Sequence, residues 1–255
     1  MEKLADIFGE DSPVLAYLSK VAAIHREAFG DALIGLYLHG SVVQGDFRPG
    51  LSDLDILGVV SGGITRALRE GLVARLSHES LPVPAFGLEL ILCVAEAVHA
   101  PIVQMPYEFA LSTGPEWGVQ METDGTTSDI LIHMQLCREA GVVLAGVPAS
   151  AALAPIPPHA IRAALMGEML WHRNDIGADP SDQALSNAVL NAARSCYAAE
   201  TGKIISKTEG GEWWMAREPD DLTVSQALSF RQGRRRFGPD VRSAQRFVEL
   251  AISRL

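Results

Sequence analysis

The alternation of apolar and polar residues over the first 113 residues predicts a mixture of helices and strands. Apolar runs of strand length, the fourth shorter and expected nearer a sheet edge, occupy residues 32–38, 54–60, 87–94 and 107–113. Ser12 and Pro13 form an N-cap and first-turn pair that predicts a helix, which Gly30 is expected to end. A second helix is expected over residues 64–79. This alternation is typical of an α/β domain.

Beyond residue 113 the strand signals fade and helical periodicity dominates. Helices are expected over residues 128–139, 159–173, 183–201, 222–232 and 239–254. The segment 147–158 is rich in proline and alanine and is interpreted as a linker. We therefore expect an α/β domain over residues 1–150, with a small mixed sheet and flanking helices, and an all-α helical bundle over residues 151–255.

Composition and charge narrow the class of protein. The net charge of -10 argues against binding to nucleic acid and permits a cationic partner. No apolar run reaches the roughly 18 residues of a membrane helix, and the acidic N-terminus is unlike a signal peptide, so a cytoplasmic location without membrane association is expected. The three cysteines are scattered, which is typical of reduced core thiols. A monomer is the default expectation.

The segment "LYLHGSVVQGDFRPGLSDLDILGVV" (36–60) carries the most informative chemistry. Asp53 and Asp55 enter an apolar strand at positions i and i+2, so both point to one face. Glu89 lies within the next apolar strand, and a sheet could place it beside them. Three carboxylates at the end of a sheet suit Mg²⁺, while the Gly40-Ser41 turn offers backbone N–H groups to phosphate oxygens. The pattern predicts metal-assisted phosphoryl or nucleotidyl transfer.

A simpler interpretation of the two aspartates is a strand-entry turn that faces water. The Gly-Ser turn upstream weighs against it, as does the acidic residue embedded in the following apolar strand, where a carboxylate needs a reason.

The motifs "HGS" (39–41), "SDLDILGVV" (52–60) and "LEL" (88–90) resemble the signature of the nucleotidyltransferase superfamily. The segments "EWGVQ" (116–120), "REAGVVLAG" (138–146) and "YAAETGKIISKTEGGEWWM" (197–215) are similar to the aminoglycoside 3''(9)-O-adenylyltransferases, which confer resistance to streptomycin and spectinomycin. The resemblance follows the same order over nearly the whole chain. It implies transfer of AMP from ATP to an antibiotic hydroxyl, with release of pyrophosphate.

By this resemblance, Asp53 and Asp55 would hold Mg²⁺, expected as two ions, on the ATP triphosphate. Glu89 would complete the metal site and act as general base on the antibiotic hydroxyl. Gly40 and Ser41 would bind phosphate. Ser52 is a further phosphate candidate, and capping of the strand entry is its alternative.

The helical half is expected to supply further contacts to ATP. Asn187 and Arg194 lie on the polar face of the helix expected over 183–201, and a lone Arg beside amides suits a triphosphate. The resemblance maps Arg194 and Lys207 onto residues that reach ATP, so that ATP would bridge the domains; Lys203 is the alternative lysine. A solvated helix face is the competing interpretation.

Trp117 and Trp171 match antibiotic-contacting aromatics of the family, with packing as the alternative. A cationic antibiotic also calls for acidic residues, but the loop within 171–187 is longer than the family pattern. Asp182 is therefore the predicted acidic contact of the antibiotic, and Asp175 and Asp179 are its alternatives. Trp213 and Trp214 are expected to pack. Two competing hypotheses are an acceptor other than an antibiotic, such as a protein or another small molecule, and a nucleotide-binding module without transfer activity.

Overall fold

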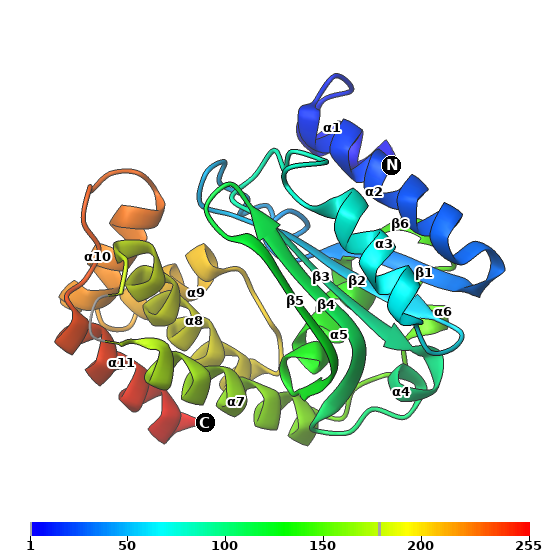
Figure 1. Cartoon of the computed structure of the whole chain (residues 1–255). Coiled ribbons are helices and arrows are strands. Elements are labelled where there is room, and N and C mark those ends of the chain that lie inside the picture. The colour runs from blue at the N-terminus through cyan, green and yellow to red at the C-terminus, as the bar shows by residue number, and fades with distance from the viewer. Residues whose placement is uncertain (1, 178–179) are drawn as a thin grey trace. The chain divides into compact units, whose positions relative to one another are not determined.

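The structure of the chain, a computed structural model, describes residues 2–177 and 180–255 (Figure 1). The chain divides into two compact units, the first ending at Ile156 and the second beginning at Pro157. The division expected after residue 150 lies six residues before this boundary. That the two units are separate functional domains stays a prediction. In the described ranges no helix is both long and apolar enough to cross a membrane.

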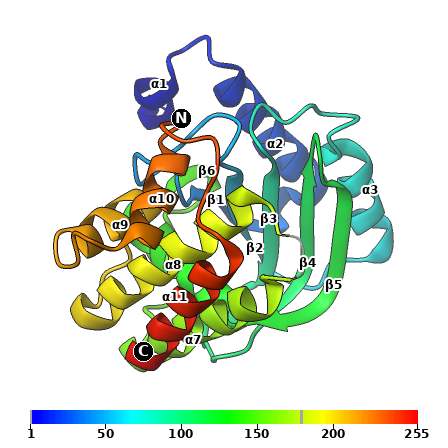
Figure 2. The same ribbon diagram turned by 90° about the vertical axis from the view of Figure 1, so that its left-hand side faces the viewer.

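The first unit combines one mixed sheet with helices. Its elements are α1 (Glu2–Phe8), α2 (Pro13–Phe29), η1 (Gly30–Ala32), β1 (Leu33–His39), β2 (Leu54–Val60), α3 (Arg66–Leu76), β3 (Leu88–Val94), α4 (Ala95–His99), β4 (Met105–Gly114), β5 (Gly118–Thr127), α5 (Asp129–Ala140), β6 (Val142–Gly146) and α6 (Ala149–Ala152). The six strands run in the order β5-β4-β3-β2-β1-β6 (Figure 2). Strands β2 and β3 are parallel, and every other neighbouring pair is antiparallel.

The two faces of the sheet bury different side chains because residues alternate along each strand. Leu54 and Ile56 of β2 and Leu88 and Leu90 of β3 join one apolar core with residues of α2 and α3. The residues between them, which include Asp55 and Glu89, therefore point to the opposite face. Helix α5 packs against β1, β2 and β4. The core on the α2–α3 side thus fixes which face of β2 and β3 carries the carboxylates.

The second unit is entirely helical in its described part, as expected. Its helices are α7 (Pro158–Asp175), α8 (Asp182–Thr201), α9 (Lys207–Met215), α10 (Leu222–Arg231) and α11 (Val241–Arg254). Trp214 is buried and its Nε1 donates a hydrogen bond to Asp221 Oδ2 at 3.0 Å, while Trp213 packs against the same core. The predicted packing role of both tryptophans is confirmed, as is the predicted fold class of the chain.

Several sequence expectations are confirmed in detail. The Ser12 side chain caps α2 and accepts from Val14 N, and Gly30 ends that helix with a positive φ of 52°. Strand β2 coincides with the apolar run 54–60. The three cysteines are buried free thiols.

One expectation about the middle of the chain is wrong, and two others hold only in part. The strand signals do not end at residue 113, because β5 and β6 follow. Strand β5 is mostly exposed, and a polar residue separates its two apolar side chains, Val119 and Met121, so no apolar run reveals it. Strand β4 is ten residues long and not short, but it lies next to the edge strand β5, so its expected place nearer an edge is confirmed. The linker expected over residues 147–158 contains the boundary between the two units, after Ile156, but it also contains the short helix α6, which begins directly after Pro148.

Candidate active site

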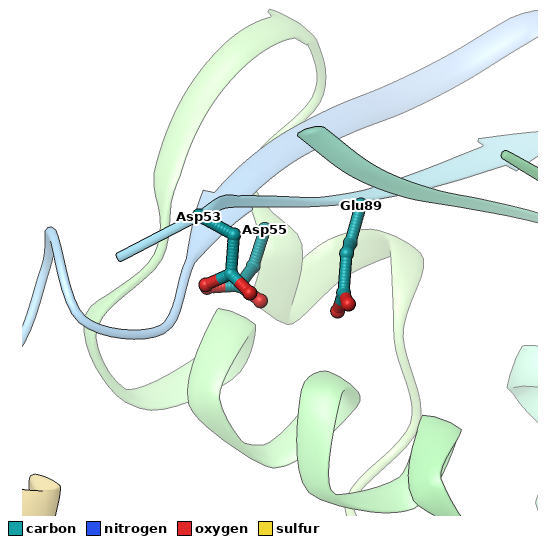
Figure 3. Close-up of side chains that lie close together, drawn as sticks. All are labelled: Asp53, Asp55 and Glu89. Atoms are coloured by element: carbon teal, nitrogen blue, oxygen red, sulfur yellow. The ribbon is translucent and has the colours of Figure 1, made fainter. Parts of the chain in front are cut away.

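Strand register brings the three predicted carboxylates together. Asp55 of β2 stands directly beside Glu89 of β3 in the parallel ladder, and Asp53 immediately precedes β2. One carboxylate oxygen from each residue lies within 4.8 Å of the others. Figure 3 shows the three side chains extending to the same side of the strands. The arrangement provides three hard oxygen donors from three different backbone positions.

The Gly40-Ser41 turn closes directly against this carboxylate group. Gly40 has φ of 69°, a conformation that favours glycine, and a Cβ at this position would collide with the Asp55 carboxylate. The Ser41 Oγ atom is buried and has no hydrogen-bond partner among the described residues. A turn with this close approach and a spare hydroxyl suits a phosphate oxygen.

Ser52 is engaged in local structure. Its Oγ accepts a hydrogen bond from the Arg48 backbone N–H at 3.0 Å, and its carbonyl accepts from Phe86 N at 3.0 Å. These bonds hold the turn that precedes Asp53. They agree with the capping alternative, while the Ser52 hydroxyl proton stays available as a donor.

The electrostatics of Glu89 reflect crowding of negative charge. Burial, followed by the charges of Asp53 and Asp55, raises the pKa of the Glu89 carboxyl to about 8. Each effect favours the protonated acid over the carboxylate. A cation bound by the three carboxylates would therefore stabilise the ionised form of Glu89.

A histidine pair lies close to the carboxylates, and its member His133 was not predicted from the sequence. Buried His39, the last residue of β1, is the register neighbour of Asp55, and its ring lies 4.7 Å from the ring of His133 on α5. His133 Nε2 forms an ion pair with Asp129 Oδ2 at 2.9 Å. Burial alone would lower the pKa of His133, but Asp129, Asp55 and Glu89 raise it to about 9. The spacing of Asp129 and His133 by four residues on one helix was the available sequence signal.

A second polar group lies in the helical unit. Arg194 of α8 donates from Nη2 to Glu168 Oε1 of α7 at 2.9 Å, and Lys207 Nζ at the start of α9 donates to Asn187 Oδ1 at 3.5 Å. Three of the predicted nucleotide-binding residues, namely Asn187, Arg194 and Lys207, therefore share one neighbourhood of α7, α8 and α9. Lys203 is exposed and lies before α9. Glu168 gave no sequence signal, because its partner lies on another helix.

Comparison with known proteins identifies the family. Residues 151–253 match the family model described as aminoglycoside adenylyltransferase, C-terminal domain, and residues 18–110 match the nucleotidyltransferase domain model. The chain belongs to the aminoglycoside adenylyltransferase family. The predicted family is thereby confirmed, and the two matched regions fall in the α/β and helical units.

Curated relatives of this adenylyltransferase-family chain are similar over most of their length. An aminoglycoside (3'') (9) adenylyltransferase of Klebsiella pneumoniae is 27% identical over 218 residues, which cover 81% of this chain and 80% of the relative. A spectinomycin 9-adenylyltransferase of Staphylococcus aureus is 28% identical over 200 residues, covering 74% of each.

The fold is shared with a solved structure. The crystal structure of spectinomycin adenyltransferase AAD(9) from Enterococcus faecialis with ATP and spectinomycin matches 94% of this chain and 98% of that chain, at a TM-score of 0.75 and 21% sequence identity.

The two tryptophans predicted to bind antibiotic differ in environment. Trp171, near the end of α7, is 58% exposed, and its ring meets the adjacent His172 edge-on at 4.9 Å. Trp117, in the turn between β4 and β5, is half-buried, with its ring against Gly87 and edge-on to Phe86 at 5.1 Å. Trp171 thus presents a free aromatic surface, whereas Trp117 also packs on the end of β3.

The acidic candidates also separate. Asp182, the first residue of α8, accepts a hydrogen bond from Gly238 N through Oδ1 at 2.7 Å, so its carboxylate helps to hold the segment that precedes α11. Asp175 is exposed at the end of α7, and Asp179 lies outside the described residues. Asp175 therefore offers the less engaged carboxylate of the two that the structure describes.

Proposed function

We propose that this protein transfers AMP from ATP to a hydroxyl of a cationic aminoglycoside or aminocyclitol antibiotic, with streptomycin and spectinomycin as the first candidates. The observation that carries the proposal is the convergence of Asp53, Asp55 and Glu89 beside the Gly40 turn. The matched family models and the names of the curated relatives agree with it.

The residues present fit a magnesium ion. Three carboxylate oxygens lie close together, and burial together with the charges of Asp53 and Asp55 raises the pKa of Glu89, which a bound cation would counteract. Asp53, Asp55 and Glu89 would hold one Mg²⁺ or, as the family resemblance implies, two. When bound, Mg²⁺ supplies neutralisation of phosphate charge and of the charge that develops during transfer.

The proposed chemistry assigns one task to each residue. The Glu89 carboxylate accepts the proton of the acceptor hydroxyl, whose oxygen forms a bond to the α-phosphorus of ATP as the bond to the bridging oxygen breaks and pyrophosphate leaves. The backbone of Gly40 and the Ser41 hydroxyl hold a phosphate oxygen. Asn187, Arg194 and Lys207 bind further phosphate oxygens, since two cations beside an amide suit a triphosphate.

Antibiotic binding is proposed for Trp171 and Trp117, with a carboxylate for the antibiotic's ammonium groups. An aromatic face attracts cations, and the exposed ring of Trp171 is available for that contact. Asp175, Asp179 and Asp182 all stay carboxylate candidates, and the hydrogen bond from Gly238 to Asp182 favours testing Asp175 before Asp182.

The decisive experiment measures pyrophosphate release from ATP and Mg²⁺ with streptomycin, spectinomycin, kanamycin or no drug. Release that depends on streptomycin or spectinomycin is expected, and release without drug, or none with any drug, would overturn the proposal. Glu89→Gln should lower turnover on the order of 10²–10⁴-fold while ATP binding is retained. Glu70→Gln, an exposed residue of α3 paired with Arg66, is the matched control and should leave turnover unchanged.

A further inference from the structure

A buried polar cluster in the helical unit contains more than the three residues proposed to bind nucleotide. We define it as the helical polar cluster, with the members Glu168, His172, Asn187, Asn191, Arg194 and Lys207. Asn191 Nδ2 donates to His172 Nε2 at 2.7 Å, which links α8 to α7 a second time. The pKa of His172 is lowered to about 4, chiefly by burial, so this ring is neutral at physiological pH. The cluster therefore combines two cations with the carboxylate of Glu168.

The ion pair within this cluster is buried on both sides. The side chains of Glu168 and Arg194 are only 11% and 12% exposed. Charges at this depth are poorly solvated, so removing one partner leaves the other without compensation. Replacing a buried ion pair by apolar residues of similar volume is often neutral or stabilising in proteins. A contribution to stability alone therefore does not explain well why a carboxylate is buried at position 168.

Several polar atoms of the cluster are buried without a partner among the described residues. They are Glu168 Oε2, Asn191 Oδ1 and Arg194 Nε. Native proteins pair most buried polar groups, and unpaired ones concentrate where a ligand or a catalytic role accounts for them. The recorded bond to Glu168 uses only the Nη2 nitrogen of Arg194, although a guanidinium carries five N–H donors in a rigid plane. Fixing one nitrogen of that plane orients the rest.

We infer that Glu168 is a positioning residue for nucleotide binding: its carboxylate oxygen fixes the plane of the Arg194 guanidinium so that the remaining N–H groups bind a phosphate oxygen. This inference rests on the proposed function, because it takes Arg194 as a contact of the ATP triphosphate. The gain is preorganisation, since an arginine already held in place loses less side-chain entropy when phosphate binds. Glu168 itself makes no contact with the nucleotide in this scheme.

The test compares Glu168→Ala and Glu168→Gln with the wild-type protein. Gln keeps an acceptor oxygen at the same reach, whereas Ala removes it. Glu168→Ala should raise the KM for ATP on the order of tenfold, as expected for loss of a charge-assisted hydrogen bond, with kcat at saturating ATP within about threefold. Glu168→Gln should restore the KM to within about threefold of wild type. Glu249→Ala, which removes the exposed partner of Arg173 in the same unit, is the control and should leave both constants unchanged.

Equilibrium binding of a fluorescent ATP analogue with Mg²⁺ tests the role of Arg194 in nucleotide binding separately from the positioning role of Glu168. If Arg194→Ala leaves binding unchanged, the assignment of Arg194 to the nucleotide fails, and the inference fails with it. If Arg194→Ala weakens binding but Glu168→Ala does not, the positioning role alone is overturned. A merely structural Glu168 would lower the melting temperature of the Ala variant without a change in KM.

Should Glu168→Ala fail to fold, Glu168→Asp replaces it. Asp keeps the charge but retracts the oxygen by one methylene, so the positioning role predicts a raised KM for Asp and not for Gln. Equal KM values for the two variants would contradict the inference.

Discussion

Gly210→Ala tests whether the helical unit depends on a close crossing of α8 and α9. Gly210 lies three residues after Lys207 on α9. A Cβ atom built at this position would lie 2.7 Å from both Cα and Cβ of Arg194 and 2.8 Å from Arg194 N. These atoms belong to the backbone and first side-chain carbon of α8, so no side-chain rotation can remove the collision. Glycine is therefore required here for helix packing and not for its φ angle.

The size of the effect follows from these distances. Carbon atoms in contact normally lie about 3.5–4.0 Å apart, so α9 must retreat by about 1 Å. Overpacking of this kind lowers the free energy of unfolding by about 1–3 kcal/mol, and the better helix propensity of Ala offsets about 1 kcal/mol of this loss. A net loss of about 1–2 kcal/mol in the free energy of unfolding is expected. The Lys207 Nζ–Asn187 Oδ1 distance of 3.5 Å is already long for a hydrogen bond, so the same shift should weaken ATP binding.

Urea unfolding followed by tryptophan fluorescence measures the loss, because buried Trp214 lies in the same core as α8 and α9. Gly211→Ala is the first control: the nearest atoms to its Cβ would be side-chain carbons of Leu228 and Leu190 at 2.7–2.8 Å, which can shift more easily than backbone, so a smaller loss is expected. Gly71→Ala, in α3 with nothing within 4 Å, should stabilise its unit by about 0.5–1 kcal/mol. A Gly210→Ala protein as stable as wild type would refute the close-packing argument.

Two further predictions concern the α/β unit. Gly40→Ala should lower pyrophosphate release at least about 100-fold, because the new methyl group would displace the Asp55 carboxylate and because φ of 69° disfavours Ala. Turnover equal to that of the wild-type protein would show that this turn does not shape the site. Burial lowers the pKa of His25, whose Nδ1 donates to Val21 O, to about 4, so the unfolded state binds the extra proton between pH 6.5 and 4. As the pH is lowered from 6.5 to 4, the free energy of unfolding should therefore decrease by up to about 3 kcal/mol. If His25→Gln shows the same dependence on pH as the wild-type protein, His25 is not the cause.

The fold was predictable where burial shapes the sequence pattern. Strand β2 is buried at every position except Asp55 and stands out as an apolar run. Capping residues in the sequence mark both ends of helix α2. Strand β5 was missed because an exposed edge strand has little apolar side to reveal; its place in the sheet comes from backbone pairing with β4 across a turn at Gly118, where φ is 63°. Pairing of this kind leaves almost no trace in composition.

The site was predictable where strand geometry alone brings residues together. The two-residue period of a strand aligns Asp53 with Asp55, and a neighbouring strand can supply Glu89. The i,i+4 spacing of Asp129 and His133 showed that these two side chains could pair, but no local pattern placed the pair near the carboxylates, and none paired Glu168 of α7 with Arg194 of α8. The residues proposed to contact ATP or metal could therefore be predicted from motifs and spacing, whereas the partners that hold them from another helix could not.

The parallel register of β2 and β3 explains why the carboxylate group and the apolar core must be specified together. A slip of one residue between these strands would move Glu89 to the face occupied by Leu88 and Leu90 and expose those leucines to the polar side. The core formed with α2 and α3 therefore holds Asp55 and Glu89 side by side as a consequence of its own packing. Trp171 lies mostly exposed near the end of a helix, where substitution costs little stability. The chemistry should therefore tolerate little change in this chain, while the choice of acceptor can vary at exposed positions such as Trp171.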